Sequence, residues 1–176
     1  MSSIDKITVL ALDVDGVLTD GTFAFDPNTK NEIKFFNAQD GMGISLWIDY
    51  GYTVVLISGR SAQCVDQRAE ELGIKFVIQG SKNKIKDLEQ VLHSLGANPK
   101  QVCFVGDDLG DIPIMEHVGY SIAVQNAADE VRSAADWITP RSGGHGAVRD
   151  AIEYILKSQK IWDSRVSSSM SKHSNQ

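Results

Sequence analysis

Short apolar stretches rich in Val and Ile recur along the chain and are nearly continuous rather than alternating with polar residues. Such continuity is typical of strands buried on both faces of a parallel sheet. The apolar stretches lie at residues 7–14, 53–57, 75–78, 102–105 and 120–124, and amphipathic segments of helical period lie at residues 41–50, 61–72, 83–95, 111–118, 127–135 and 146–157. This alternation predicts an α/β fold, a doubly wound parallel sheet of the Rossmann-like kind with right-handed crossovers.

One segment interrupts this alternation of strands and helices. Residues 22–25 and 32–36 alternate apolar and polar side chains, and Asp26, Pro27 and Asn28 stand between them. Period-two alternation on both sides of turn-forming residues predicts an antiparallel hairpin. We expect this β-hairpin after the first strand, as a flap beside the first loop of the sheet.

The composition is that of one globular domain with a single core. The chain has 176 residues, of which 42% are hydrophobic and 23% charged, so collagen, coiled coil and wholesale disorder are disfavoured. Beyond about residue 160 the sequence becomes Ser-rich and polar, and it cannot bury itself. We therefore predict a domain at residues 1–160 and a disordered tail at residues 161–176.

The net charge and the number of cysteines limit the classes of binding partner and the cellular compartment that fit this chain. With 17 basic and 23 acidic residues, the formal net charge of −6 argues against binding nucleic acid or an anionic membrane through bulk charge. The apolar stretch at residues 7–12 is too short for a signal peptide or a membrane span. Cys64 and Cys103 cannot form a disulfide framework. We expect a cytoplasmic protein with reduced cysteines.

Polar residues follow the predicted strands, at the edge where open parallel sheets bind ligands. These residues are Asp13, Asp15, Ser58, Gly59, Arg60, Asp107, Asp108 and Asp111, together with Lys84 at the start of a helix. Carboxylates packed this closely repel, by about 4 kcal/mol for two unit charges 4 Å apart at an effective dielectric near 20. A divalent cation would neutralise them, and an oxygen-only set without His or Cys favours Mg²⁺, the usual partner of phosphate. The sequence thus predicts a metal and a phosphoryl group in one site.

Asp13 and Asp15 lie on the same side of the first strand, because successive strand residues point to opposite faces. One carboxylate can therefore attack phosphorus while the other handles the proton of the leaving group. Lys84 and the Ser58 hydroxyl would neutralise the charge of the phosphoryl oxygens, and Gly16 would let backbone amides approach them.

In this order of motifs the sequence closely resembles the haloacid dehalogenase superfamily of phosphotransferases. Its four signature elements are matched by Asp13-Val14-Asp15-Gly16-Val17, by Ser58-Gly59-Arg60, by Lys84, and by Gly106-Asp107-Asp108 with Asp111. The resemblance implies that Asp13 is the nucleophile and forms an aspartyl-phosphate, and that Asp15 is the acid and then the base. It also implies Mg²⁺ bound by Asp13, by the backbone carbonyl of Asp15 and by Asp107, with Gly59, Asp108 and Asp111 in support.

The intervals between these motifs hold only the hairpin and ordinary helices, so we expect no cap domain. Within the capless group the chain resembles the phosphatases that release 3-deoxy-D-manno-octulosonate (KDO) from its 8-phosphate, through residues 36–44, Gln79-Gly80 and residues 143–149. This likeness implies a homotetramer with the hairpins at its centre and a sugar-acid phosphate as substrate. The implied substrate-binding residues are Asp15, Asn37, Ala38, Gln39, Asp40, Gly41, Arg60, Arg68 and Lys84.

Three alternatives stay open. The family often carries basic residues where Gln39 and Ser45 stand, so a nonulosonate 9-phosphate of the sialic-acid type is a second candidate substrate. A phospho-accepting receiver domain also combines clustered aspartates, Mg²⁺, Ser or Thr, and Lys on a doubly wound sheet. Arg60 and Arg68 have a purely structural alternative, in which they form ion pairs with Asp66, Glu70 or Glu71.

Overall fold

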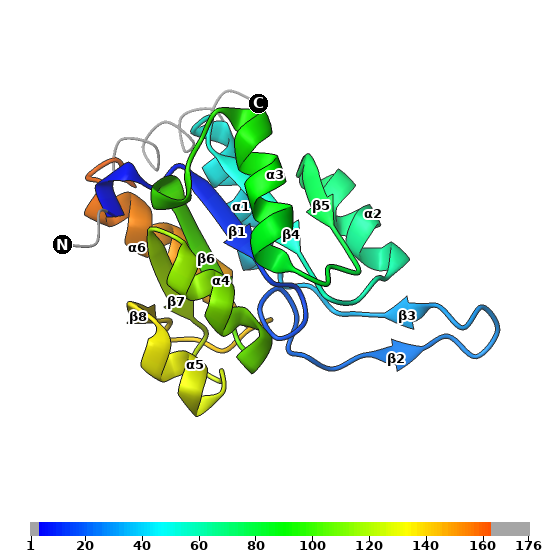
Figure 1. Ribbon diagram of the computed structural model, residues 1–176. Coiled ribbons are helices and arrows are strands. Elements are labelled where there is room, and N and C mark those ends of the chain that lie inside the picture. Colours follow the sequence, from blue (N-terminus) through cyan, green and yellow to red (C-terminus); the bar gives the residue numbers. More distant parts are fainter. Residues whose placement is uncertain (1–3, 163–176) are drawn as a thin grey trace, which may run out of the picture.

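The computed structural model describes residues 4–162 and is shown in Figure 1. Apart from Ile161 and Trp162, the predicted tail at residues 161–176 lies outside the described residues. Among the described residues, six parallel strands form one sheet in the order β5-β4-β1-β6-β7-β8. The strands are β1 (Val9–Leu12), β4 (Thr53–Ile57), β5 (Phe76–Ile78), β6 (Val102–Gly106), β7 (Tyr120–Ala123) and β8 (Trp137–Ile138). The predicted doubly wound parallel sheet is therefore confirmed.

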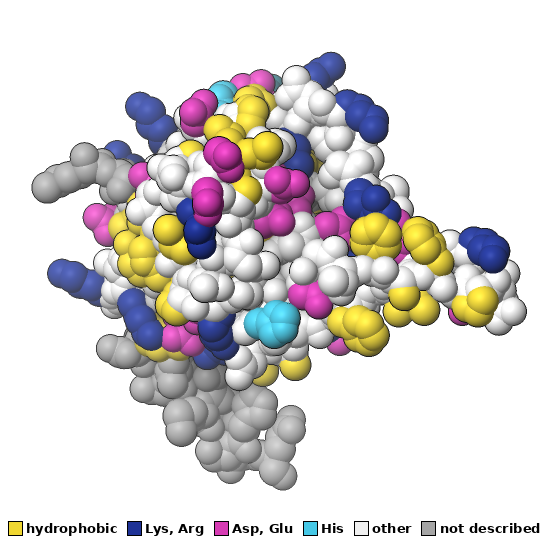
Figure 2. Space-filling model, turned by 90° about the horizontal axis from the view of Figure 1, so that it is seen from below, with side chains coloured by type: hydrophobic (Ala, Val, Ile, Leu, Met, Phe, Trp, Pro, Cys, Tyr) yellow, Lys and Arg dark blue, Asp and Glu magenta, His cyan; other side chains and the backbone are white. Residues whose placement is uncertain are grey.

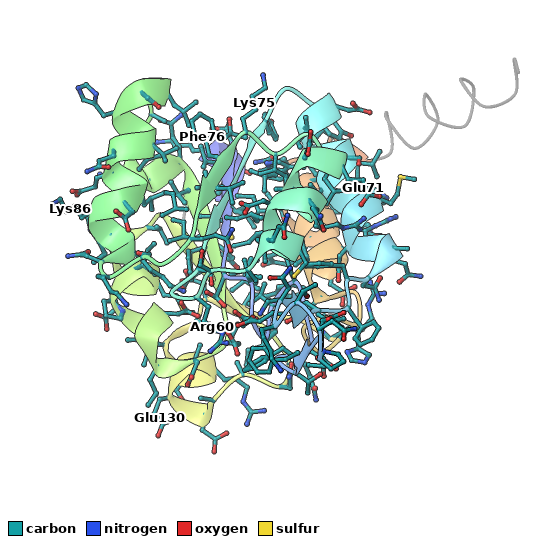
Figure 3. The ribbon with its side chains drawn as sticks, turned by 90° about the vertical axis from the view of Figure 1, so that its right-hand side faces the viewer. Arg60, Glu71, Lys75, Phe76, Lys86 and Glu130 are labelled. Carbon is teal, nitrogen blue, oxygen red and sulfur yellow. The ribbon has the colours of Figure 1, made fainter. Side chains whose placement is uncertain are left out.

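Helices cover both faces of the sheet: α1, α2 and α6 lie on one side and α3, α4 and α5 on the other (Figures 1 and 3). Their bounds are α1 (Ala38–Asp49), α2 (Gln63–Glu71), α3 (Lys84–Leu95), α4 (Ile112–His117), α5 (Asp129–Ala134) and α6 (Ala147–Ser158), with short 3₁₀ turns η1 (Ile4–Lys6), η2 (Pro99–Gln101) and η3 (Leu109–Asp111). Trp47, Phe104 and Ile152 are completely buried in the core. Burial of the sheet on both faces explains why its strands read as continuous apolar stretches.

The predicted hairpin consists of β2 (Ala24–Phe25) and β3 (Glu32–Ile33), which pair antiparallel and project from the domain (Figure 1). Its turn is held by Asp26, whose Oδ1 accepts hydrogen bonds from the backbone N–H groups of Asn28 and Thr29, both at 2.8 Å. The paired strands are shorter than predicted. Beyond Ile33 the chain continues toward the domain, which brings the next residues to the edge of the main sheet.

The connections that hold a cap in many larger enzymes are short in this fold. Between β1 and β4, and between β4 and α3, the described chain contains only the hairpin, α1, α2 and β5, so the expected absence of a cap holds for this part of the molecule. Cys103 is buried in β6 and Cys64 is half-buried in α2, and both are free. No helix among residues 4–162 has the length and apolar character that crossing a bilayer requires.

Candidate active site

The site lies at the carboxyl edge of the sheet, where β1, β4 and β6 run side by side. Leu12 of β1 is in register with Leu56 of β4 and with Val105 of β6, so the residues that follow these strands emerge together. A cavity of about 260 Å³ opens there, lined by Asp13, Asp15, Ser58, Gly59, Arg60, Lys84, Asp107, Asp108, Gly110 and Asp111. All nine of the residues singled out from the sequence at this edge thus line one cavity. Viewed from this edge in Figure 2, acidic and basic side chains lie close together near the hairpin.

The turn after β1 brings its backbone against the late acidic loop. Gly16 has a φ of +96°, and a Cβ added there would stand 2.0 Å from Oδ2 of Asp107. Thr19 Oγ1 accepts hydrogen bonds from the N–H groups of Gly16 at 3.3 Å and Gly21 at 3.2 Å, which closes the turn. Only glycine fits both this backbone conformation and this close approach. The sequence therefore brings Asp13 and Asp107 together through a residue without a side chain.

Lys84 is the cation at the centre of the carboxylates. It is the first residue of α3, and its Nζ donates to Asp13 Oδ1 and, at 2.7 Å, to Asp111 Oδ1. Burial lowers the pKa of Lys84, but the charges of Asp13 and Asp111 outweigh this effect and hold the pKa above its usual range. Lys84 is therefore not a solvated helix lysine, since its side chain is 15% exposed and pairs with two carboxylates.

Asp111 stabilises the loop that carries Asp107. Its side chain is almost completely buried, and its Oδ2 accepts from the backbone N–H of Asp107 at 3.0 Å, while its Oδ1 takes the bond from Lys84. Asp108 accepts from the N–H of Leu109 at 2.8 Å and so caps the following 3₁₀ turn. Both residues stabilise the loop through these bonds, and the supporting role implied for them in metal binding stays a prediction.

A divalent cation fits this group of carboxylates. Asp13, Asp107 and Asp111 each offer an oxygen, and the three oxygens lie within 4.8 Å of one another. Because both oxygens of Asp111 already accept hydrogen bonds, Asp13 and Asp107 are the carboxylates best able to bind an ion. A set that offers only oxygen ligands, few of them from the protein, suits Mg²⁺. The predicted third ligand, the backbone carbonyl of Asp15, stays a prediction.

The two carboxylates that face this ion are the ones whose ionisation is most perturbed. Burial, followed by the neighbouring charges of Asp111 and Asp15, raises the pKa of Asp13 to about 7 against the opposing effect of Lys84. Burial, followed by the charges of Asp13, Asp111 and Asp108, raises the pKa of Asp107 to about 8. Without a cation, the ionised forms of both carboxylates are therefore disfavoured, first by burial and then by mutual repulsion.

The raised pKa values of Asp13 and Asp107 predict that the stability of the fold depends on pH, and that a bound metal ion reduces this dependence. Because their pKa values are raised on folding, Asp13 and Asp107 hold protons in the folded state that the unfolded chain has lost, so stability falls as pH rises from about 4 through 7 to 8. In EDTA we expect the melting temperature to fall between about pH 5.5 and pH 8, and Mg²⁺ to raise it most at the higher pH. Asp107→Asn should weaken both effects in the same thermal scans. A slope and an Mg²⁺ response that are the same in wild type and Asp107→Asn would contradict this assignment.

The hairpin contributes a residue to the site that the sequence analysis missed. Lys34 follows β3, is 7% exposed, and donates from Nζ to Asp15 Oδ1 while lying 3.0 Å from Glu32 Oε2. Burial lowers the pKa of Lys34, but Asp15 and Glu32 raise it by more. The signal was present: Lys34 interrupts the apolar residues Ile33, Phe35 and Phe36 with a charge, which predicts a side chain that turns away from its neighbours.

Arg60 connects this group to the sheet. Its guanidinium contacts Glu32 Oε1, lies 4.0 Å from Asp15 Oδ2, and stacks 4.2 Å from the centre of the Phe23 ring. Figure 3 labels Arg60 at the lower edge of the sheet, next to the hairpin. Arg60 thus lies in the predicted site and joins it to the hairpin by charge and by aromatic contact.

The other implied substrate residues lie at the start of α1, outside the lining of this cavity. Asn37 caps α1 by accepting from the N–H of Gln39 at 2.8 Å, and it donates to the carbonyl of Gly144 at 3.3 Å. The Gly144 N–H in turn donates to Val17 O at 3.0 Å, which joins this region to the turn after β1. Gln39 accepts from Arg141, a residue that the sequence analysis did not single out. Substrate binding by Asn37, Ala38, Gln39 and Gly41 stays a prediction.

Asp40 and Arg68 have structural partners. Asp40 is 1% exposed, and its carboxylate accepts from the N–H groups of Gly146 at 3.2 Å and Arg149 at 2.8 Å, so it caps α6. Arg68 forms an ion pair with Glu71 at 2.8 Å, which is the structural alternative stated for it. It also reaches the backbone carbonyl of Asn37 at 3.4 Å, so a role at the start of α1 is compatible with this pairing.

Three comparisons with known proteins bear on this site. A family model described as haloacid dehalogenase-like hydrolase matches residues 76–152. The sequence is 41% identical over 159 residues, 90% of this chain and 84% of the relative, to the 3-deoxy-D-manno-octulosonate 8-phosphate phosphatase KdsC of Escherichia coli.

Two solved structures share the fold over most of their length. The crystal structure of the 3-deoxy-D-manno-octulosonate 8-phosphate phosphatase from Yersinia pestis superposes with a TM-score of 0.88 at 38% identity, covering 91% of this chain and 86% of that one. The corresponding enzyme from Moraxella catarrhalis, in complex with a magnesium ion, a phosphate ion and KDO, superposes with a TM-score of 0.89 at 37% identity, covering 94% of both chains.

Proposed function

The chain belongs to the haloacid dehalogenase-like hydrolases, in the branch of the 3-deoxy-D-manno-octulosonate 8-phosphate phosphatases, and on this premise we propose that it hydrolyses 3-deoxy-D-manno-octulosonate 8-phosphate to KDO and phosphate. The observation that carries the proposal is the single cavity in which Asp13, Ser58, Lys84 and Asp107 meet from four separate segments. Family membership excludes the alternative of a receiver domain. Mg²⁺ is the cofactor, since a similar structure is a complex with a magnesium ion, a phosphate ion and KDO.

In the first step, Asp13 acts as the nucleophile. A carboxylate oxygen of Asp13 forms a bond to phosphorus while the bond from phosphorus to the sugar oxygen breaks, which gives an aspartyl-phosphate. Lys84 neutralises charge at the nucleophile and the phosphoryl group. Ser58 Oγ accepts from the N–H of Arg60 at 3.0 Å, so its own hydrogen remains available for a phosphoryl oxygen.

Asp15 moves the protons of both steps. It gives a proton to the departing sugar oxygen, then takes one from the water that attacks phosphorus, and this second step releases phosphate and restores the Asp13 carboxylate. The cation held by Asp13, Asp107 and the Asp15 carbonyl supplies further charge neutralisation when bound. Attack of one anion on another otherwise has a high electrostatic barrier.

The substrate is tested by phosphate release from a panel in the presence of Mg²⁺. The panel contains KDO 8-phosphate, a nonulosonate 9-phosphate and glucose 6-phosphate. We expect the highest kcat/KM with KDO 8-phosphate. Preference for the nonulosonate 9-phosphate would select the second candidate substrate, and equal turnover of all three compounds would contradict a sugar-acid phosphatase.

We further propose that the protein is a homotetramer that works in the cytoplasm, with no nucleic-acid or membrane partner. The hairpin supports the assembly, because it exposes apolar side chains that a second copy can cover: Phe23, Phe25, Ile33 and Phe35 are 41, 57, 41 and 75% exposed. Figure 2 shows hydrophobic side chains gathered along the hairpin. Exposed apolar patches of this kind mark interaction surfaces.

Charging this surface is expected to dissociate the assembly. Phe25→Lys combined with Phe35→Lys places two cations on the exposed side of the hairpin, where burial against a second copy would require their desolvation. Light scattering after size exclusion should show a tetramer for the wild type and a smaller species for the double variant. Leu95→Lys, at an exposed position at the end of α3, is the matched control and should leave the mass unchanged. A double variant of unchanged mass would contradict assembly through the hairpin.

A further inference from the structure

We propose that Lys34 is a positioning residue for Asp15, and that the hairpin delivers it to the site. This inference rests on the function proposed above, in which Asp15 transfers the proton of the leaving group. The Lys34 ammonium donates to one oxygen of Asp15, Oδ1, which fixes the orientation of the carboxylate. The other oxygen, Oδ2, is 4.0 Å from Arg60 Nε, beyond hydrogen-bond distance, and so remains available for the leaving oxygen.

The segment around β3 turns its charged residues inward and its apolar residues outward. The side chains of Lys34 and Glu32 are 1% and 12% exposed, whereas the alternate residues Ile33 and Phe35 are 41% and 75% exposed as whole residues. A free hairpin would gain nothing from burying a lysine and exposing two large apolar side chains. This arrangement is explained if the inward side contacts Asp15 and the outward side packs against another surface.

The charges around Asp15 are balanced. Lys34 lies against Asp15 and Glu32, and Arg60 also contacts Glu32, so two cations meet two carboxylates. An ammonium removed from water is strongly destabilising unless carboxylates pair with it. The Lys34 ammonium also lies 5.2 Å from the centre of the Phe23 ring, which favours the cation further. Lys34 is therefore held at Asp15 from several sides.

The two lysines of the site pair with different carboxylates. Lys84, from α3, pairs with Asp13 and Asp111, while Lys34, from the hairpin, pairs with Asp15. Loss of Lys34 should therefore leave the nucleophile and its phosphoryl contacts intact and disturb the proton donor alone. In a fold whose described residues include no cap, the hairpin then orients Asp15.

The choice of leaving group separates this role from a structural one. A sugar alkoxide is a poor leaving group and needs a proton, whereas p-nitrophenolate leaves without one. For Lys34→Met we expect kcat with KDO 8-phosphate to fall about 100-fold with a small change in KM, whereas the rate of the p-nitrophenol burst from p-nitrophenyl phosphate, which reports the first step alone, should change less than about threefold. Lys34→Arg, which restores a cation, should recover part of the loss. Lys30→Met, at an exposed position in the same hairpin, is the control and should behave as wild type.

Equal losses in KDO 8-phosphate turnover and in the rate of the p-nitrophenol burst would overturn the proposal, because a lysine that only tethers the hairpin would affect the first step with every substrate alike. Unchanged turnover of KDO 8-phosphate would overturn it too. If circular dichroism shows that Lys34→Met does not fold, Lys34→Gln takes its place with the same expected split between substrates. A wild type that hydrolyses neither compound would instead refute the proposed function, so the two failures are distinguishable.

Discussion

Asp13→Asn is expected to lower the rate of phosphate release by about 10⁴-fold or more, with every phosphate ester tested. The carboxamide has neither the charge nor the basicity to attack phosphorus, and the other carboxylate that Lys84 contacts, Asp111, already accepts from the backbone N–H of Asp107. The loss should be the same for KDO 8-phosphate and for p-nitrophenyl phosphate, because both reactions begin with the same attack. Steady-state phosphate release measures it.

Two controls separate the loss of a nucleophile from the loss of the fold. Asp129→Asn changes an 86% exposed carboxylate that pairs with Arg132 on the same helix, and it should retain full activity. Acid-quenched wild type should carry phosphoryl label after incubation with ³²P-labelled substrate, and Asp13→Asn should carry none. Substantial turnover by a folded Asp13→Asn variant would show that another group attacks phosphorus.

Most of the site could be predicted because it follows from strand order and residue type alone. Residues that end neighbouring parallel strands meet at one edge, so Asp13, Ser58 and Asp107 needed only a correct assignment of strands. Lys84 followed from its place at the start of the next helix. Each of these positions depends on local sequence and on general rules of sheet topology, and the cavity at the edge of the sheet contains all of them.

The features that were missed depend on tertiary contacts. The local pattern marks Lys34 as a side chain that turns away from its apolar neighbours, but its contact with Asp15 arises only because the chain after β3 returns to the edge of the sheet. Substrate binding by Asp40 stays a prediction, whereas its capping of α6 through the N–H groups of Gly146 and Arg149, more than a hundred residues further along the chain, is a tertiary contact that its local motif does not indicate. The edge strand β8 was missed because two residues, Trp137 and Ile138, are too few to form a pattern.

Asp15→Asn is expected to give a loss that depends on the leaving group. The amide cannot give a proton to a sugar alkoxide, so kcat with KDO 8-phosphate should fall about 10³-fold. With p-nitrophenyl phosphate the first step needs no proton, and Asp13 with its Lys84 partner remains in place. Aspartyl-phosphate should then form quickly and persist, because the water that attacks it has lost its base.

A rapid-quench experiment with p-nitrophenyl phosphate tests this separation of steps. Asp15→Asn should release a burst of p-nitrophenol close to one equivalent of enzyme and then turn over slowly, whereas Asp13→Asn should release no burst. The contrast requires the nucleophile and the acid to be different residues, held by different lysines, as the ion pairs of Asp13 with Lys84 and of Asp15 with Lys34 indicate. If Asp15→Asn gave no burst, Asp15 would take part in the attack itself, and the assignment of separate roles to the two carboxylates would be wrong.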